Sequence, residues 1–362
     1  YCGQCVCWSM GRSAALAASD FISSISHSRS KDFPRFRGAA RNGSDDHAHA
    51  NTRLISTVVF RGVTMVQSSQ RIELGFVGIG RMGLPMTGRL IAAGHTVHVW
   101  DIASDRMDAA AKAGAKAAKH AAEVADRAEI VFLCLTDGAA VEEVVFGSDG
   151  IALAHGPEKV VVDLSSIHPD GTRSIAARLK AANGMAWIDA PVSGGPKGAA
   201  EGTLAVMAGG QEVEIERIRP YVLAMGQRLT RMGDVGAGQT TKLCNQIIAA
   251  CSMVVMAEAT RLAVNAGIDA TRLPEALAGG FADSIPLQLF VPRMAKGVYE
   301  PQIGPVSIIL KDLDMIADVA RTNGTPLPMA GLAAQMFRLL KAARGSQADV
   351  LEVYKLSEPR RS

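Results

Sequence analysis

One stretch decides the fold of this chain: Ile72-Glu73-Leu74-Gly75-Phe76-Val77-Gly78-Ile79-Gly80-Arg81-Met82-Gly83. An apolar, strand-like run ends in three glycines, and a helix-compatible stretch follows them. In a dinucleotide site the first glycine permits a tight turn, the second lets the backbone approach a pyrophosphate, and the third allows close packing of helix on strand. The helix N-terminus then faces the anionic phosphates. The pattern predicts that a dinucleotide binds at Gly78, Ile79, Gly80, Arg81, Met82 and Gly83.

A strand predicted at 95–100 ends in Asp101, about twenty residues after the glycine turn, as a dinucleotide fold requires. A carboxylate at this place accepts hydrogen bonds from the adenosine ribose and repels a 2′-phosphate. The next residue is Ile102 rather than an arginine, so no partner for such a phosphate is expected here. This favours NAD over NADP. A solvated aspartate that opens a turn is the other interpretation.

The 362 residues are enough for two domains. After the glycine turn, strand-like and helix-like segments alternate as far as residue 235, which is typical of a doubly wound, mainly parallel sheet. We therefore predict an α/β Rossmann-type NAD-binding domain over residues 71–235. Its strands are expected at 74–77, 95–100, 129–135, 159–164, 186–190 and 203–208, and its helices at 85–93, 106–118, 141–146 and 172–182.

From residue 236 onward the pattern becomes helical throughout. A long helix is expected at 240–266, and further helices at 273–278, 287–294, 306–322 and 329–343. We predict an all-α C-terminal domain over residues 236–358, for substrate binding and oligomerisation. The cleft between the two domains is where a substrate would meet the cofactor.

Residues 1–70 differ from the rest of the chain. They are rich in Ser, Arg, His and small residues and lack a core-sized apolar pattern. Three explanations are open: a transit peptide, a disordered regulatory arm, or upstream sequence translated through a misassigned start. We favour the third, with Met65 as the natural first residue, and leave the segment out of the fold.

Bulk properties exclude several function classes. The net charge of +3 is too balanced to predict a nucleic-acid partner. We find no apolar run of about eighteen residues and expect no membrane partner. Cys2 and Cys5 lack a second ligand pair at zinc-site spacing, so no metal is expected. The three later cysteines are expected to be buried thiols in a reducing, cytoplasmic compartment: Cys134, Cys244 and Cys251.

A glycine-rich loop follows the strand expected at 186–190. Ser193 offers a hydroxyl, and the residues after it, Gly194 and Gly195, offer unhindered backbone amides. Such a loop can bind a carboxylate. A plain glycine-rich turn is the alternative, but the loop lies at the carboxyl end of a strand, which is the ligand side of an open α/β sheet.

Lys242 and Asn245 are three residues apart near the start of the long helix, so both lie on one face. A lysine near a helix N-terminus, and partly buried, has a lowered proton affinity and can act as an acid or base near neutral pH. A surface lysine on an amphipathic helix fits the same spacing. The adjacent opposite charges of Lys311 and Asp312 are typical of a solvated face.

Together these stretches resemble the 3-hydroxyisobutyrate dehydrogenase family of β-hydroxyacid dehydrogenases, which includes tartronate semialdehyde reductase and has a 6-phosphogluconate-dehydrogenase-like fold. The resemblance runs from Ile72 to the final helix. It is carried by the sequences from Phe76 to Met86, from Asp163 to Ile167, from Asp189 to Thr203, from Gly236 to Gln246 and from Lys311 to Leu313.

The resemblance implies roles for individual residues. Ser193, Gly194 and Gly195 would hold the substrate carboxylate, with Lys311 closing over substrate and cofactor. Lys242 would be the catalytic acid or base, and Asn245 would orient the reacting oxygen. Two departures fall on cofactor loops: Leu135-Thr136 stands where the family has Leu-Pro, and Ser166 stands where it has Thr. Both loops are still expected to contact the cofactor.

The implied reaction is NAD-dependent interconversion of a small β-hydroxy acid and its semialdehyde or keto form, by a homodimer or homotetramer. An NADP-linked succinic semialdehyde or glyoxylate reductase is the nearest alternative. Imine reductases share the fold but generally lack the lysine found at Lys242. Non-catalytic, chromatin-associated relatives have lost that lysine and carry extra reader domains.

Overall fold

The computed structural model describes residues 72–358. The predictions for residues 1–70, including those for Met65, Cys2 and Cys5, lie outside the described residues.

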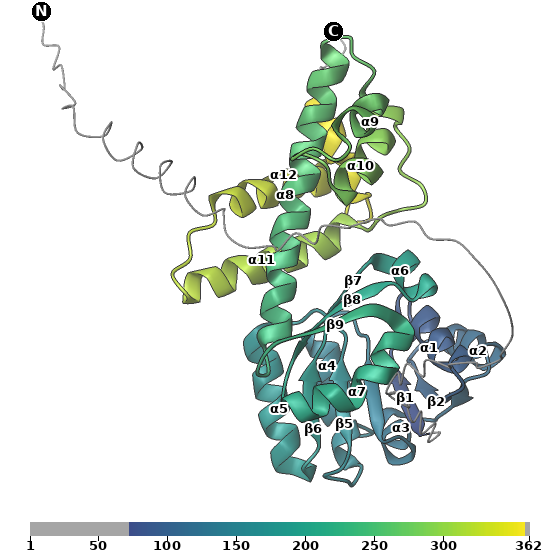
Figure 1. The fold of residues 1–362 in the computed structure, drawn as a ribbon. Helices are drawn as coiled ribbons and strands as arrows, with labels where there is room; N and C mark the ends of the chain where they lie inside the picture. The colour runs from purple at the N-terminus through teal and green to yellow at the C-terminus, as the bar shows by residue number, and fades with distance from the viewer. Residues whose placement is uncertain (1–71, 359–362) are drawn as a thin grey trace, which may run out of the picture. The chain divides into compact units, whose positions relative to one another are not determined.

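The first part of the described chain is a nine-stranded sheet with helices on both faces (Figure 1). Its elements are β1 (Glu73–Val77), α1 (Gly83–Ala92), β2 (Thr96–Trp100), α2 (Ser104–Lys112), β3 (Lys116–Ala117), α3 (Ala121–Arg127), β4 (Ile130–Leu133), α4 (Gly138–Phe146), η1 (Ile151–Leu153), β5 (Val160–Asp163), α5 (Pro169–Asn183), β6 (Ala186–Asp189), β7 (Val192–Ser193), α6 (Gly195–Glu201), β8 (Leu204–Gly209), α7 (Glu212–Met225) and β9 (Gly226–Gly233).

The strand order is β3-β2-β1-β4-β5-β6-β8-β7, with β9 paired to β8. Neighbours from β3 to β6 are parallel, whereas β8 runs antiparallel to β6 and β7. The order reverses between β1 and β4, and ligands of doubly wound sheets bind at such a point. The predicted α/β Rossmann-type sheet is confirmed.

The parallel strands are buried on both faces. In β1, Leu74 and Phe76 belong to the core that packs on α1 and α7. Val77 belongs to the opposite core, which packs on α3, α4 and α5. Successive side chains of a strand point to opposite faces, so a strand covered on both sides needs an unbroken apolar run. This explains why these strands could be predicted from the sequence.

The second part is helical. Its elements are α8 (Ala237–Asn265), η2 (Ala270–Arg272), α9 (Leu273–Leu277), α10 (Ile285–Lys296), α11 (Val306–Thr322), α12 (Pro328–Arg344) and η3 (Val350–Ser357). No named strand occurs in residues 234–358. The first turns of α8 contact β8, and the rest of the helix contacts α10, α11 and α12 (Figure 1). The predicted all-α part is confirmed; its boundary at residue 235, in the turn between β9 and α8, stays a prediction.

The prediction about apolar runs needs a correction at α8. By length and composition this helix is apolar enough to cross a membrane, although core helices of soluble proteins pass the same test. The residues that interrupt its apolar character, such as Glu258 and Arg261, are too few to lower the average of a long window. About a third of that window is buried against the rest of the protein.

Two further predictions were wrong in part, and several elements, β9 among them, were not predicted. The helix expected at 106–118 ends at Lys112, because Gly114 adopts the left-handed conformation (φ 94°) and β3 follows. β9 was missed because its sequence is mostly polar and exposed, and only pairing with β8 makes it a strand. Cys244 is exposed, on the uncovered side of α8, whereas Cys134 and Cys251 are partly buried and burial raises the pKa of both thiols.

Candidate active site

The glycine turn between β1 and α1 leaves no room for larger residues at two of its three glycines. Gly78 has φ 87°, and a Cβ placed on it would lie 2.5 Å from the carbonyl oxygen of Cys134. A Cβ on Gly83 would overlap the carbonyl oxygen of Gly78. The turn therefore lies directly against the end of β4, and α1 begins at Gly83 without a side-chain cap. The N–H groups of an uncapped helix N-terminus, next to backbone that carries no side chains, form the kind of site that binds a pyrophosphate.

The side chain of Asp101 is buried against the glycine turn and is not solvated. Its Oδ2 accepts a hydrogen bond from the N–H of Ile79 at 2.9 Å. Oδ1 accepts one from the N–H of Ala103 at 2.9 Å. The expectation that no cation would lie at this spot is wrong. Arg106, in the first turn of α2, places Nη1 3.4 Å from both carboxylate oxygens, because the helix turns back over the strand end.

The loops after β4 and β5 meet at one cation. Lys311 on α11 donates from Nζ to the carbonyl oxygens of Thr136, at 3.1 Å, and Ser166, at 2.8 Å. Beneath them, the N–H of Leu135 donates to Oγ of Ser165 at 2.9 Å. The predicted loop residues Leu135, Thr136 and Ser166 therefore lie together, with Lys311 over them.

The predicted substrate loop faces the long helix α8. Oγ of Ser193 lies 3.4 Å from Oδ1 of Asn245, and Nζ of Lys242 donates to the carbonyl oxygen of Val192 at 2.8 Å. Gly194 and Gly195 both have positive φ, 135° and 63°, which glycine adopts without strain. The structure thus brings Ser193, Lys242 and Asn245 into direct or neighbouring contact.

Lys242 is half-buried rather than a free surface lysine. Burial lowers the pKa of its ammonium, the carboxylate of Asp312 opposes that effect, and the nearby charge of Lys311 lowers the pKa further. Burial disfavours the charged form of an amine, and a like charge does the same. An amine in this environment releases and takes up a proton more readily than an exposed lysine.

Sequence reasoning missed the role of Asp312, which was expected on a solvated face. The residue is 2% exposed, and its Oδ2 accepts a hydrogen bond from Nε2 of Gln246 at 2.5 Å. Oε1 of Gln246 in turn accepts from Nδ2 of Asn245 at 2.8 Å. A continuous polar chain therefore runs from the substrate loop to α11. The only sequence signal for it was the position of Asp312 beside Lys311.

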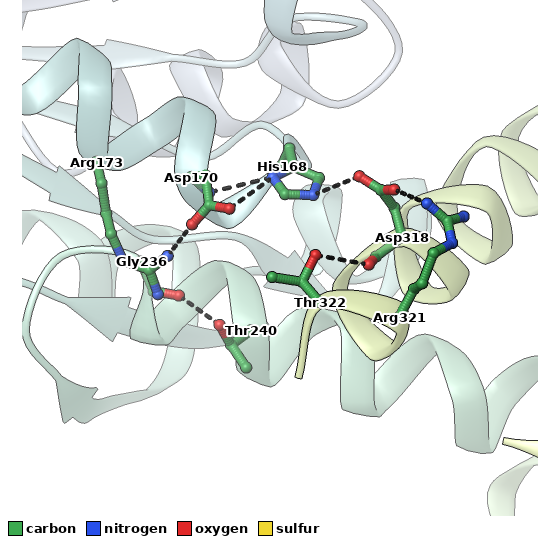
Figure 2. Close-up of polar contacts among 8 residues, drawn as sticks. All are labelled: His168, Asp170, Arg173, Gly236, Thr240, Asp318, Arg321 and Thr322. Carbon is green, nitrogen blue, oxygen red and sulfur yellow. Dashed lines mark hydrogen bonds and ion pairs between the residues drawn. The ribbon is translucent and has the colours of Figure 1, made fainter. Parts of the chain in front are cut away.

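A second contact from α11 reaches the loop after β5, and Figure 2 shows it. His168 caps α5 with Nδ1, which accepts from the N–H of Asp170 at 3.1 Å. In the neutral ring the hydrogen must then lie on Nε2, which is 3.3 Å from Oδ2 of Asp318. Asp318 is also paired with Arg321 at 2.7 Å. This contact was not predicted, since nothing local links the residues.

Within residues 72–358 no three His, Cys, Asp or Glu side chains are grouped so that they could hold a metal ion. The polar side chains where the substrate loop meets α8 are those of Ser193, Lys242 and Asn245. Their chemistry suits binding of a carboxylate and transfer of a proton.

Comparisons with known proteins agree with this arrangement. Residues 73–233 match the family model described as the NAD binding domain of 6-phosphogluconate dehydrogenase. Residues 236–357 match the model for the NAD-binding domain of NADP-dependent 3-hydroxyisobutyrate dehydrogenase. Among curated relatives, 2-hydroxy-3-oxopropionate reductase of Escherichia coli K12 is 38% identical over 278 residues, covering 77% of this chain and 94% of the relative. NAD-dependent L-serine dehydrogenase of Pseudomonas aeruginosa is 33% identical, covering 79% and 98%.

Solved structures show the same likeness. A 3-hydroxyisobutyrate dehydrogenase of Mycobacterium tuberculosis, solved with L-serine, has a TM-score of 0.72 at 29% identity and covers 80% of this chain and 99% of its own. A 3-hydroxyisobutyrate dehydrogenase of Salmonella typhimurium has a TM-score of 0.71 at 31% identity, covering 79% and 99%. On this evidence the chain belongs to the 3-hydroxyisobutyrate dehydrogenase family, whose members are NAD(P)-dependent oxidoreductases of hydroxy acids.

Proposed function

We propose that this enzyme interconverts a small β-hydroxy acid and its semialdehyde or keto form, with NAD as cofactor and Lys242 as the general acid and base. The observation that carries the proposal is the position of Lys242. Its Nζ lies 2.8 Å from the carbonyl oxygen of Val192, one residue before the serine of the substrate loop. Burial lowers the pKa of this amine, which suits proton transfer near neutral pH.

The residues around the glycine turn fit a dinucleotide. The open backbone at Gly80, where only the Arg106 side chain comes within 4 Å of an added Cβ, and the uncapped N-terminus of α1 would receive its pyrophosphate. Asp101 would accept hydrogen bonds from its adenosine ribose. Thr136 and Ser166 would lie along its nicotinamide half. When bound, the cofactor gives or accepts the hydride.

The protein's own residues would bind and orient the substrate and transfer the proton. Ser193 and the backbone of Gly194 and Gly195 bind the substrate carboxylate. Asn245 orients the hydroxyl that is to react. In oxidation the carbon loses a hydride and its hydroxyl loses a proton, which passes to the neutral amine of Lys242. In reduction the ammonium of Lys242 returns that proton and stabilises the negative charge developing on the oxygen.

The substrate we propose is tartronate semialdehyde with its alcohol, or 3-hydroxyisobutyrate. Support comes from the relatives named 2-hydroxy-3-oxopropionate reductase, at 38% identity, and 3-hydroxyisobutyrate dehydrogenase, at 34% and 33%. Relatives named for L-serine and L-threonate are 33% and 31% identical. These compounds share a carboxylate and a hydroxyl, so the same loop and lysine would serve each of them.

An NADP-linked semialdehyde or glyoxylate reductase is the second candidate. Arg106 supports it, because its guanidinium lies 3.4 Å from Asp101 and could pair with a 2′-phosphate. The family model that matches residues 236–357 is also described as that of an NADP-dependent enzyme. The carboxylate of Asp101, fixed by two backbone N–H groups, supports NAD.

We also propose a homodimer or homotetramer. Ile248, Val255 and Leu262 recur at seven-residue intervals along α8 and are 68%, 46% and 73% exposed. An apolar stripe of this kind is typical of a surface buried between subunits. A cytoplasmic location is proposed as well, on the single, unpaired cysteines of the described residues.

Two measurements test the proposed function. A panel of 3-hydroxyisobutyrate, tartronate semialdehyde, glycerate and threonate is assayed with NAD and with NADP by the absorbance of the reduced cofactor. The variant Lys242→Ala is then assayed on the best substrate. Turnover should fall by about 10²- to 10⁴-fold, the usual value of general acid–base catalysis, while cofactor affinity is retained. Unchanged turnover in Lys242→Ala would refute the mechanism.

A further inference from the structure

The long helix α8 has no N-terminal cap of its own. Its N-cap residue is Gly236, in the left-handed conformation and without a side chain. The first N–H groups of a helix lack intrahelical partners and must be satisfied by other groups. Here the partner is Asp189, the last residue of β6. Its Oδ1 accepts from the N–H of Gly236 at 2.7 Å and its Oδ2 from the N–H of Gln239 at 2.8 Å.

Two glycines let the helix approach the sheet closely enough for this contact. A Cβ on Gly209, in β8, would lie 2.5 Å from Oδ1 of Asp189 and 2.8 Å from the N–H nitrogen of Gly238. A Cβ on Gly238 would overlap the carbonyl oxygen of Asp189. The first turn of α8 is therefore packed onto the ends of β6 and β8 without intervening side chains.

A second tie comes from the same helical turn. Gln239 is 1% exposed; its Nε2 donates to the carbonyl oxygen of Ser165 at 2.8 Å, and its Oε1 accepts from the N–H of Ile167 at 3.1 Å. Asp189 and Gln239 together fix the start of α8 against two places: the end of β6 and the loop after β5. Figure 2 draws Gly236 and Thr240 of the same turn, with the hydrogen bond that Oγ1 of Thr240 donates to the carbonyl oxygen of Gly236.

This anchor lies one turn of helix before Lys242 and a few residues before Ser193. Asp189 and Ser193 are on one continuous segment, and the carbonyl of Val192 between them accepts the hydrogen bond from Lys242. The lysine and the serine are thus both positioned from the same end of β6. A displacement of about 1 Å between a catalytic group and its substrate can lower turnover about 10²-fold.

The two hydrogen bonds from the start of α8 require a carboxylate at residue 189. Asp189 is fully buried, and burial raises the pKa of its carboxyl to about 7, against the two backbone hydrogen bonds, which lower it. The carboxylate of Asp163, its register neighbour on β5, contributes to this raised pKa. An asparagine of the same size offers one acceptor oxygen, and its amide N–H₂ would face a backbone N–H. Only an ionised carboxylate of this length satisfies both helix N–H groups.

On the strength of the proposed role of Lys242, we propose that Asp189 is a positioning residue of the reaction. Asp189 accepts hydrogen bonds from the N–H groups of Gly236 and Gln239 at the start of α8. In this way it fixes the distance between the amine of Lys242 and the substrate that Ser193 holds. Asp189 itself touches neither substrate nor cofactor.

The test is the isosteric variant Asp189→Asn, assayed near pH 8 in the full chain. We expect kcat to fall about 10- to 100-fold, while KM for the hydroxy acid and the dissociation constant of NADH change by no more than about twofold. The primary isotope effect on kcat, with substrate deuterated at the carbon that loses hydride, should rise, because the chemical step becomes slower. A purely structural role would not produce this combination.

The matched control is Asp349→Asn. Asp349 is also a buried capping aspartate and accepts from the N–H groups of Leu351, Ile303 and Gly304 at 2.9, 2.6 and 3.2 Å. It lies on none of the proposed site elements, so this variant should lose thermal stability but keep kcat. If it loses kcat to the same degree, the effect at Asp189 is general destabilisation and the proposal is overturned.

Gly209→Ala is the second variant, should Asp189→Asn fail to fold. It keeps every polar group but pushes on Oδ1 of Asp189 and on the backbone of Asp234 and Gly238 at the start of α8, and we expect the same fall in kcat at unchanged NADH affinity. Normal kcat in a folded Asp189→Asn protein overturns the positioning role alone. Normal kcat in Lys242→Ala overturns the proposed function instead, so the two failures are distinguishable.

Discussion

Lys311 of α11 and Ser166 of the loop after β5 are joined by a 2.8 Å hydrogen bond from the lysine ammonium to the serine carbonyl oxygen, although they lie 145 residues apart in the sequence. Seven residues further along α11, Asp318 reaches His168 in the same loop. Residues seven apart lie on one face of a helix, so α11 holds the predicted cofactor loop at two points.

Loss of the contact between Asp318 and His168 should weaken cofactor binding, because the same loop is also held by Lys311. We predict that Asp318→Ala raises KM for NAD about two- to fivefold, the range expected for loss of one exposed polar contact. His168→Asn should act likewise, because asparagine still caps α5 but does not reach Asp318. In a double-mutant cycle the two changes should not add. Arg321→Gln, which removes the other partner of Asp318, is the control and should leave KM for NAD near its original value.

The cofactor preference should depend on Asp101 and Arg106 in opposite ways. Asp101→Ala removes the carboxylate that repels a 2′-phosphate, so kcat/KM with NADP should rise relative to NAD about tenfold or more. Arg106→Ala should lower kcat/KM with NADP about tenfold, the value of a charge-assisted hydrogen bond, and change that with NAD little. Assays with both cofactors on each variant measure this. A preference of the unmutated enzyme for NADP would contradict the NAD assignment.

The pH dependence of the two reaction directions should be opposite. Burial lowers the pKa of Lys242 from its ordinary value of 10.5. Reduction needs the ammonium, so kcat/KM for reduction should fall as pH rises through the lowered pKa. Oxidation needs the neutral amine, so its kcat/KM should rise over the same interval. Initial rates from about pH 6 to about pH 10 test this, and Lys242→Arg, which stays charged throughout, should abolish the rise.

Stability should depend on pH through Asp163. Burial raises the pKa of this carboxyl to about 6 from an ordinary value of 3.8. Between these values the folded protein binds more protons at this group than the unfolded chain does. Unfolding free energy contributed by the group is therefore present at low pH and is lost as pH rises through about 6. In Asp163→Asn the midpoint of thermal unfolding should therefore fall less steeply with rising pH between 3.8 and about 6. An unchanged slope in that variant would show that Asp163 does not titrate there.

Local signals explain what could be predicted. The strands of the parallel sheet are continuous apolar runs, such as Ile130–Leu133, because both of their faces are buried. The glycine turn is recognisable because backbone approach and positive φ demand glycine at fixed positions. The long helix α8 follows from its composition, and the positions of Ser193 and Lys242 follow from motifs that each lie within one loop or one helical turn.

The sequence by itself determined the parallel strands of the sheet, most of the helices and the glycine turn, and it predicted which groups react. Only the tertiary structure decided that Asp312 is buried, that Arg106 lies over Asp101, and that Asp189 caps a helix whose N-cap residue lies 47 residues later. The reason is physical: burial and the satisfaction of a helix N-terminus depend on which distant segments pack together. Composition and spacing within one segment carry no record of that packing.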